Sequence, residues 1–242
     1  MKDFQLHDIE TAPEDSQPLL KGSIKAFGMI PNLHAVMAQS PAVLEAYQQL
    51  HALAQKSSFD KEQLTVVWQT INVEHNCKYC VPAHTMIAGS MNVSGEISDA
   101  LRDESELPTT ELNVLRDTTL AIVRNRGIVS DSELATFYEA GFTKQQLLEI
   151  VLVLSQKVMS NYINHLADTP LDKPFQEFEW SKKTSSLTSS EPNHEIFSSK
   201  TIADLLHRCV DNVCSLNPWR IDDVCTRIAN DYQTQSHPVR CQ

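Results

Sequence analysis

The chain has 242 residues, long enough to bury a hydrophobic core without disulfide support, because a domain of this size hides roughly 70 % of the surface that its unfolded form exposes. Its 20 Lys and Arg residues against 31 Asp and Glu residues give a formal net charge of -11 at pH 7. Because this charge repels phosphate backbones and anionic lipid headgroups, we expect neither nucleic acid nor a membrane surface as a partner.

Two further patterns concern where the protein works. Residues 1–17 are polar and acidic, without the positively charged start and apolar stretch of a secretory signal. The longest apolar run, around residues 150–154, is far shorter than the roughly 20 residues of a spanning helix. We therefore expect a cytoplasmic protein, in which six cysteines favour redox, catalytic or metal-binding thiols over structural disulfides.

The composition and the apolar spacing predict an all-α protein. Only six glycines occur, and stretches rich in Val, Thr and aromatic residues at period two are missing. Ser40 and Pro41 mark the start of a helix that runs to about residue 56. Its apolar residues recur at intervals of three and four and form one buried face: Val43, Leu44, Tyr47, Leu50, Leu53 and Ala54.

Capping residues predict the later helices. Asp60, three residues before Gln63, is a favourable N-cap for a helix that turns Trp68 inward and leads to the cysteines. Thr143 caps a long helix to about residue 168, hydrophobic nearly all round and therefore expected to be central to the core. Between these two helices, three others are expected over residues 94–102, from 109 or 110 to about 126, and over 130–140.

A change of composition marks a domain boundary near residue 181. Five serines occur among residues 181–190 without apolar periodicity, as in a flexible linker. We predict one domain over residues 1–180 and a linker with a short helical or partly disordered tail over 181–242. Apolar spacing around 202–213 and 221–228 is typical of two short helices, and the role of this tail stays unassigned.

The chemistry is concentrated in residues 74–84, which contain two thiols, two imidazoles and a carboxylate. Glu74, Cys77, Cys80 and His84 are three or four positions apart, so a continuous helix would place them along one stripe. Pro82 is tolerated only in the first turn of a helix, which predicts a helix start no earlier than residue 79 or 80.

A helix that begins at residue 79 or 80 would make the Cys80 thiol more acidic and therefore more reactive. At a helix N-terminus the backbone N–H groups stabilise a thiolate and lower a thiol pKa from about 8.5 to roughly 3.5–7.5. His84, one turn later, is placed to exchange protons with this sulfur. A thiolate that attacks a peroxide becomes a sulfenic acid, and Cys77 is the natural thiol to convert it to a disulfide.

The segment 77–84 is similar to the C-x-Y-C-x-x-x-H signature of the AhpD-like alkylhydroperoxidases in the carboxymuconolactone decarboxylase superfamily. Residues 161–165 and 169–172 resemble a later segment of uncharacterised members, and the similarity extends over roughly residues 20–180. The resemblance implies an all-α AhpD-like domain that forms homo-oligomers (trimers, hexamers or dimers). It also implies an antioxidant enzyme that works without a cofactor, either a thiol peroxidase that reduces a hydroperoxide with electrons from a thiol or dithiol, or a disulfide reductase.

By motif position, Cys80 would be the peroxide-attacking thiol, Cys77 its partner and His84 the proton-relay histidine. The better-studied members carry a relay glutamate twelve residues before the first cysteine, where this chain has Thr65. We hypothesise that Glu74 supplies the missing carboxylate.

Other functions use the same residues. The cysteines could belong to a non-enzymatic redox sensor, or to a metal site completed by His75 or by Cys209 and Cys214. A lactone decarboxylase, the activity that names the superfamily, needs no dithiol and is disfavoured by both cysteines. The polar group Asn161, Asn164 and His165 is expected to face water at the end of its helix, with a pocket lining as the alternative.

Overall fold

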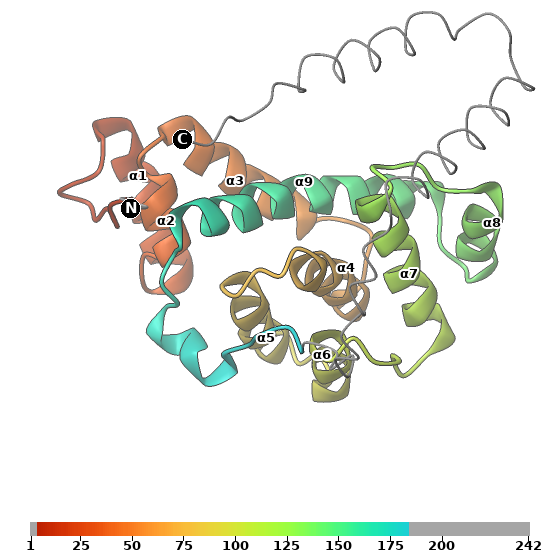
Figure 1. The fold of residues 1–242 in the computed structure, drawn as a ribbon. Coiled ribbons are helices and arrows are strands. Elements are labelled where there is room, and N and C mark those ends of the chain that lie inside the picture. The colour runs from red at the N-terminus through yellow and green to blue at the C-terminus, as the bar shows by residue number, and fades with distance from the viewer. Residues whose placement is uncertain (1–3, 184–242) are drawn as a thin grey trace, which may run out of the picture. The chain divides into compact units, whose positions relative to one another are not determined.

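The computed structural model describes residues 4–183, and in this range every regular element is helical (Figure 1). The all-α prediction is confirmed. The proposed tail helices and cysteines beyond residue 183 lie outside the described residues, as does most of the predicted linker. The elements are η1 (Glu14–Ser16), α1 (Gln17–Phe27), α2 (Asn32–Met37), α3 (Pro41–Ala54), α4 (Lys61–Glu74), α5 (Cys80–Ser90), α6 (Gly95–Arg102), α7 (Thr110–Arg124), α8 (Asp131–Glu139), α9 (Lys144–Ala167) and η2 (Lys173–Phe178).

Capping boxes begin the two helices that frame the core. In α4 the Asp60 carboxylate accepts from the backbone N–H of Gln63, whose side chain accepts from the Asp60 N–H. Thr143 and Gln146 repeat this arrangement at the start of α9. The helix starts expected from these capping residues are confirmed. Helices α1 and α2 were not predicted, because their sequences are short and lack a capping box.

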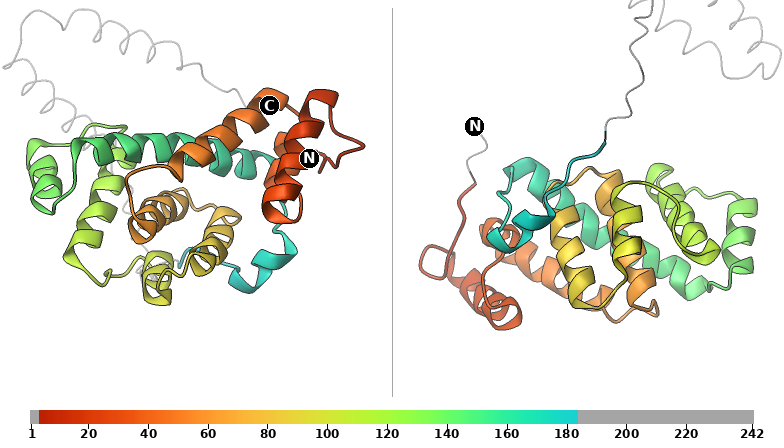
Figure 2. Two further views of the ribbon diagram at one scale, coloured as in Figure 1. Left: turned by 180° about the vertical axis from the view of Figure 1, so that it is seen from behind. Right: turned by 90° about the horizontal axis from the view of Figure 1, so that it is seen from below.

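Helix α4 is the centre of the described domain, surrounded by α5, α6, α7 and α9 (Figure 1). Its apolar side chains, Trp68 and Ile71 among them, are fully buried in one core cluster with residues of α6, α7 and α9. Seen from behind, α3 packs along α9 (Figure 2). A second apolar cluster joins Leu20, Leu33 and Leu44 of α1–α3 to Cys77 and Cys80. The cysteines therefore belong to the core rather than to a surface loop.

The prediction for the long helix α9 is wrong in one respect. It was expected to be hydrophobic nearly all round and buried, yet Leu148 is 71 % exposed and Leu166 is 63 % exposed. The fully buried side chains of its inner face are largely polar: Gln156, Lys157, Ser160 and Asn161. Buried polar groups normally have hydrogen-bond partners, so the inner face of α9 is expected to form hydrogen bonds in the core as well as to pack there.

Within residues 4–183, none of the helices has the combination of length and apolar composition needed to cross a membrane.

Candidate active site

The backbone around the cysteines breaks between two helices. Helix α4 ends at Glu74, Asn76 adopts a left-handed conformation with φ of 52°, and α5 begins at Cys80. The Cys77 N–H donates to the Asn72 carbonyl at 3.0 Å and so folds the chain back onto the end of α4. Pro82 stands in the first turn of α5, where no N–H is needed. The helix start inferred from Pro82 is confirmed.

Because of this break, the expected single stripe is wrong for Glu74. Its two carboxylate oxygens accept hydrogen bonds of 2.8 and 2.7 Å from Arg124 on α7, and this guanidinium lowers the pKa of Glu74. The carboxylate lines a separate small hollow with Arg116 and Asp117. The structure therefore brings Cys77, Cys80 and His84 into one region of the core and places Glu74 outside it.

The two sulfur atoms share polar neighbours. The Cys80 N–H points at Cys77 Sγ at 3.3 Å, and Asn164 Nδ2 donates to Cys80 Sγ at 3.2 Å and to Cys77 Sγ at 3.9 Å. Both cysteines are buried and free thiols. A single amide from α9 thus contacts both sulfurs, and the pair is set up to share one negative charge.

The surroundings of the two thiols shift their pKa values in opposite directions. Burial disfavours a Cys80 thiolate, but a hydrogen bond from Cys77, the charge of Lys157 and the polar side chains of Ser160 and Asn161 outweigh it and lower the pKa of Cys80 to about 6. The hydrogen bond to Cys80, burial and the charge of Cys80 raise the pKa of Cys77 above its usual range. At neutral pH, these surroundings therefore favour a thiolate at Cys80 and a protonated thiol at Cys77.

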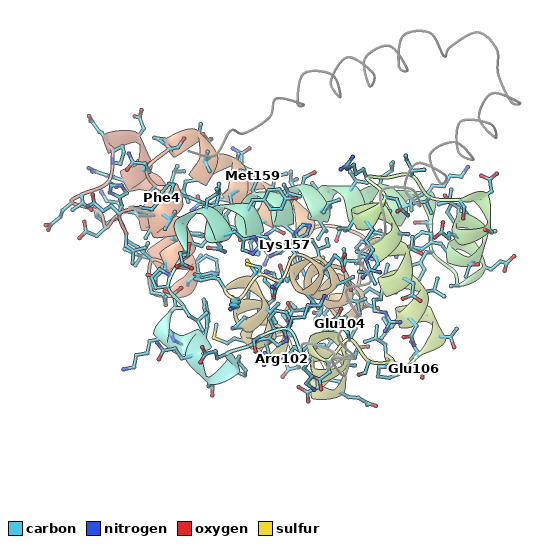
Figure 3. All side chains as sticks on the ribbon, viewed as in Figure 1. Phe4, Arg102, Glu104, Glu106, Lys157 and Met159 are labelled. Carbon is cyan, nitrogen blue, oxygen red and sulfur yellow. The ribbon has the colours of Figure 1, made fainter. Side chains whose placement is uncertain are left out.

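Lys157 is the residue that the sequence analysis missed. It is fully buried on the side of α9 that faces α4 and α5 (Figure 3), and its Nζ donates to Nε2 of His84 at 2.8 Å. Burial lowers the pKa of Lys157, whereas the neighbouring cysteines, Cys80 more than Cys77, raise it. Burial and the Lys157 charge hold the pKa of His84 well below its usual value, so His84 is neutral. With Nε2 accepting from the Lys157 ammonium, the ring proton is assigned to Nδ1.

The spacing on α9 contains the signal that could have identified Lys157. Polar residues recur at intervals of three and four along the second half of this helix: Gln156, Lys157, Ser160, Asn161 and Asn164. A polar stripe on a helix normally faces water, and here it faces the core. The sequence alone does not show whether this stripe faces water or the core, because it does not show which side of α9 lies against the cysteines.

The prediction that the asparagines face water is wrong. Asn161 and Asn164 are buried, and the Asn161 amide donates to Asn72 Oδ1 at 3.0 Å and accepts from His75 Nδ1 at 2.9 Å. This network ties α9 to the end of α4, directly beside the dithiol. His165 is exposed and lines a cavity next to Cys77. Thr65, twelve residues before Cys77, is buried, and its hydroxyl donates to the Lys61 carbonyl at 2.7 Å within α4.

Cys80 and His84 line an apolar cavity of about 240 Å³. We call it the apolar cavity; its wall is mainly aromatic and aliphatic and includes Phe27, Leu33, Tyr47, Tyr79, Met86 and Phe175. Two more imidazoles stand in this wall, those of His34 and His51, and burial lowers the pKa of each to about 4. At neutral pH both imidazoles are therefore neutral, and the Cys80 sulfur is the charged group in this wall.

Cys77 borders a second cavity of about 390 Å³, which we call the polar cavity. It is lined by Lys78, Asn164, His165, Asp168 and Thr169, with His75, Asn76 and Tyr79. Tyr79 borders both cavities, and its hydroxyl donates to Asp172 Oδ2 at 2.5 Å. The dithiol thus lies between two cavities of opposite polarity.

Within residues 4–183, no group of three or more His, Cys, Asp or Glu side chains lies close enough together to hold a metal ion. Cys209 and Cys214, which were considered as further ligands, lie outside the described residues. The described polar side chains around Cys77 and Cys80 include amides, the Ser160 hydroxyl, an amine and an imidazole, which suit proton and thiol chemistry.

Comparisons with solved structures identify the fold. An uncharacterised peroxidase-related protein from Ralstonia eutropha JMP134, described as an alkylhydroperoxidase AhpD core, matches with a TM-score of 0.63 and 17 % identity over 70 % of this chain and 92 % of its own. A peroxidase-related protein from Silicibacter sp. TM1040 matches with a TM-score of 0.61 and 16 % identity over 72 % of this chain and 92 % of its own. The debrominase Bmp8, solved in complex with 2,3,4-tribromopyrrole, matches with a TM-score of 0.57 and 14 % identity over 72 % of this chain and 94 % of its own.

No protein-family model matches the sequence, and no curated protein matches it significantly. The chain has the AhpD-like fold, and its relatives in structure include peroxidase-related proteins and a debrominase. Identities of 14 to 17 % establish the fold alone, so the activity has to be argued from the site.

Proposed function

We propose that this protein is a thiol-dependent oxidoreductase that reduces hydroperoxides through Cys80 and Cys77. One observation carries the proposal. Cys80, the thiol with the lowered pKa, lines the apolar cavity together with the neutral imidazole of His84, which is hydrogen-bonded to the buried ammonium of Lys157. These are the groups that a peroxide reduction needs, namely a thiolate, a proton source and a place for the organic part of the substrate.

The first step is attack of the Cys80 thiolate on the terminal oxygen of the hydroperoxide. A sulfur–oxygen bond forms, the oxygen–oxygen bond breaks, and Cys80 becomes a sulfenic acid while the alkoxide leaves. The apolar cavity would hold the alkyl or aryl group and exclude water from the reacting atoms.

The leaving alkoxide needs a proton, which Lys157 and His84 are placed to supply. The Lys157 ammonium already donates to Nε2 of His84, and His84 lines the cavity. A proton passed from Nδ1 of His84 to the alkoxide is replaced at Nε2 by the Lys157 proton, so the imidazole never has to hold a positive charge in the core. In this scheme Lys157 takes the place of the carboxylate that Thr65 does not provide.

In the last step of this half-reaction, the Cys77 thiol attacks the Cys80 sulfenic acid, which releases water and leaves a disulfide. Two electrons from an external thiol or dithiol then restore the two thiols. A partner protein's disulfide could be reduced by the same pair, with Cys80 as the attacking thiolate.

Turnover tests the proposal and separates an enzyme from a redox sensor. With an excess of dithiothreitol, the protein should consume cumene hydroperoxide continuously, and Cys80→Ser should abolish this activity. A single oxidation per chain without further consumption would identify a sensor. The exposed variant Thr110→Ser, on α7 and away from the dithiol, is the matched control.

A second candidate function is the reductive removal of a halogen from an aromatic ring. The debrominase with this fold was solved with tribromopyrrole, and the apolar cavity here has a mainly aromatic and aliphatic wall that suits a flat ring. The reaction balances with the same groups, because two thiols and a carbon–bromine bond yield a disulfide, a carbon–hydrogen bond and hydrogen bromide. Bromide release from tribromopyrrole in the presence of dithiothreitol would favour this function over peroxide reduction.

A further inference from the structure

The two cavities give the two cysteines separate surroundings. Cys80 lines the apolar cavity and Cys77 lines the polar cavity, with Tyr79 between them. A dithiol enzyme needs two different reactants, an oxidising substrate and a reducing thiol. If both entered on the same side, each would have to leave before the other could bind.

The chemistry of disulfide exchange assigns the reductant to the Cys77 side. A thiolate that attacks one sulfur of a disulfide expels the other, and the sulfur with the lower thiol pKa leaves faster. The environment holds the pKa of Cys80 near 6 and raises that of Cys77, so attack on Cys77 expels the better leaving group. Attack on Cys80 would expel the poorer one.

Two residues that line the polar cavity also have side-chain oxygen atoms without partners. Asn164 Oδ1 and Thr169 Oγ1 are buried and form no hydrogen bond within the described structure, although Asn164 Nδ2 contacts both sulfurs. Buried polar atoms are normally paired, and unpaired oxygen atoms on residues that line a cavity favour a ligand with N–H or O–H donors. Lys78 and Asp168 add one positive and one negative group at the same wall.

We propose that the polar cavity binds the reducing thiol, and that this thiol is peptide-like, with amide N–H donors and a carboxylate. Its N–H groups would donate to Asn164 Oδ1 and Thr169 Oγ1, and its carboxylate would pair with Lys78. Glutathione has this chemistry. The inference rests on the proposed function and adds a class of electron donor and its point of entry.

The reductive half-reaction then runs in two exchanges. The donor thiolate attacks Cys77 Sγ, which forms a mixed disulfide and releases the Cys80 thiolate. A second donor thiolate attacks the donor's own sulfur, which yields the oxidised donor and returns Cys77 to a thiol. Cys77 is buried in the dithiol form, so the Asn164 side chain must swing aside. Among the described residues, Asn164 Nδ2 donates only to the two sulfur atoms, which are weak acceptors.

The site of attack is tested on the full-length protein oxidised with diamide, so that the result does not depend on any peroxidase activity. The disulfide is treated with glutathione, quenched with iodoacetamide and digested with trypsin, which cleaves after Lys78 and separates the two cysteines. We expect glutathione on the Cys77 peptide and a carbamidomethyl group on the Cys80 peptide. Glutathione on Cys80 would overturn the proposal.

The binding site is tested by the rate of the same reduction. Reduction by glutathione should saturate with concentration and exceed reduction by 2-mercaptoethanol, which has no amide. Thr169→Phe, which fills the cavity, should reduce the glutathione rate to that of 2-mercaptoethanol, and Thr169→Val, which removes only the unpaired hydroxyl, should weaken saturation without unfolding the protein. Equal rates for the Thr169 variants and the exposed control Thr110→Phe would overturn the proposal, whereas failure of peroxide to oxidise the dithiol would overturn only the proposed peroxidase function.

Discussion

At the scale of single residues, the lowered pKa of Cys80 depends in part on a lysine far along the chain. Lys157 has no exposed surface and donates to His84, and its charge is one of the factors that lower the pKa of Cys80 to about 6. A buried ammonium is costly unless negative or polar groups surround it, and the dithiol supplies the negative charge. Cys80 and Lys157 therefore stabilise each other's charged forms.

Replacing Lys157 by Met should shift the pH dependence of Cys80 oxidation. In the wild type the rate should rise with pH through about 6 and level off above it, because the thiolate is the reactive form. Without the ammonium, the midpoint should move up toward about 8.5, so the rate at pH 7 should fall by about tenfold or more and recover at higher pH. Stopped-flow measurement of the reaction with cumene hydroperoxide between pH 5 and 9 checks this.

The Glu74→Gln variant is the control for the effect of Lys157→Met on the pH dependence of Cys80 oxidation. The Glu74 carboxylate pairs with Arg124 and lines neither cavity beside the sulfurs, so its loss should leave the pH profile in place. It should cost at most about 1 kcal/mol of stability, as for other partly exposed ion pairs. A profile that shifts with Glu74→Gln and stays fixed with Lys157→Met would restore the carboxylate to the mechanism and remove the lysine.

At the scale of elements, α9 holds the domain together through its polar inner face. Gln156 accepts from the Trp68 indole at 2.9 Å and donates to His51 Nδ1 at 3.1 Å, and Asn161 bonds to Asn72 of α4. These bonds fix the helix against α4 in one register, and so they also fix Lys157 and Asn164 against the dithiol.

Gln156→Leu should destabilise the domain. The substitution leaves the buried indole N–H of Trp68 without an acceptor, which costs about 1–3 kcal/mol. Ser155→Ala, an exposed neighbour on the same helix, should stay within about 0.5 kcal/mol of the wild type. Urea denaturation followed by tryptophan fluorescence measures both changes, and equal stability of the two variants would show that the bond contributes nothing.

The capping residues and Pro82 were sufficient to predict α3 to α9 and the start of α5, because these signals are local in sequence. The inner face of α9 could not be predicted, since a polar stripe alone does not show whether water or another helix faces it. The placement of Glu74 failed for a related reason. The left-handed Asn76 breaks the helix between Glu74 and Cys77, and three-to-four spacing carries no information across such a break.

At the scale of the whole molecule, acid should weaken the described domain through its buried imidazoles. Burial lowers the pKa values of His34 and His51 to about 4, compared with 6.5 in the unfolded chain. The unfolded state therefore binds more protons below pH 6.5, and stability is lost as the pH falls from 6.5 toward 4.

The loss should be about 2 kcal/mol for each of these two histidines between about pH 6.5 and about pH 5. A protein with both His34→Gln and His51→Gln should show a correspondingly shallower dependence of the free energy of unfolding on pH. Urea titrations at a series of pH values provide the comparison. An unchanged slope in the double variant would mean that these imidazoles are protonated in the folded state.

The outer face of α9 carries exposed apolar residues that are relevant to oligomer formation. Leu148, Val151, Tyr162 and Leu166 are exposed along one helix, more apolar surface than a helix facing water normally presents. We propose that a second copy of the chain covers this face, in keeping with the homo-oligomers that the sequence resemblance implies. Light scattering coupled to size exclusion should show an oligomer for the wild type and a smaller species for a Leu148→Glu, Leu166→Glu protein. The same mass for both proteins would place any interface elsewhere.

The central claim is that Cys80 and Cys77 form a redox pair, and mass spectrometry after one equivalent of hydroperoxide tests it most directly. We predict a loss of two hydrogens and a disulfide that links the tryptic peptides containing Cys77 and Cys80, absent in Cys80→Ser. Unmodified thiols at both positions, with the oxidation elsewhere in the chain, would contradict it.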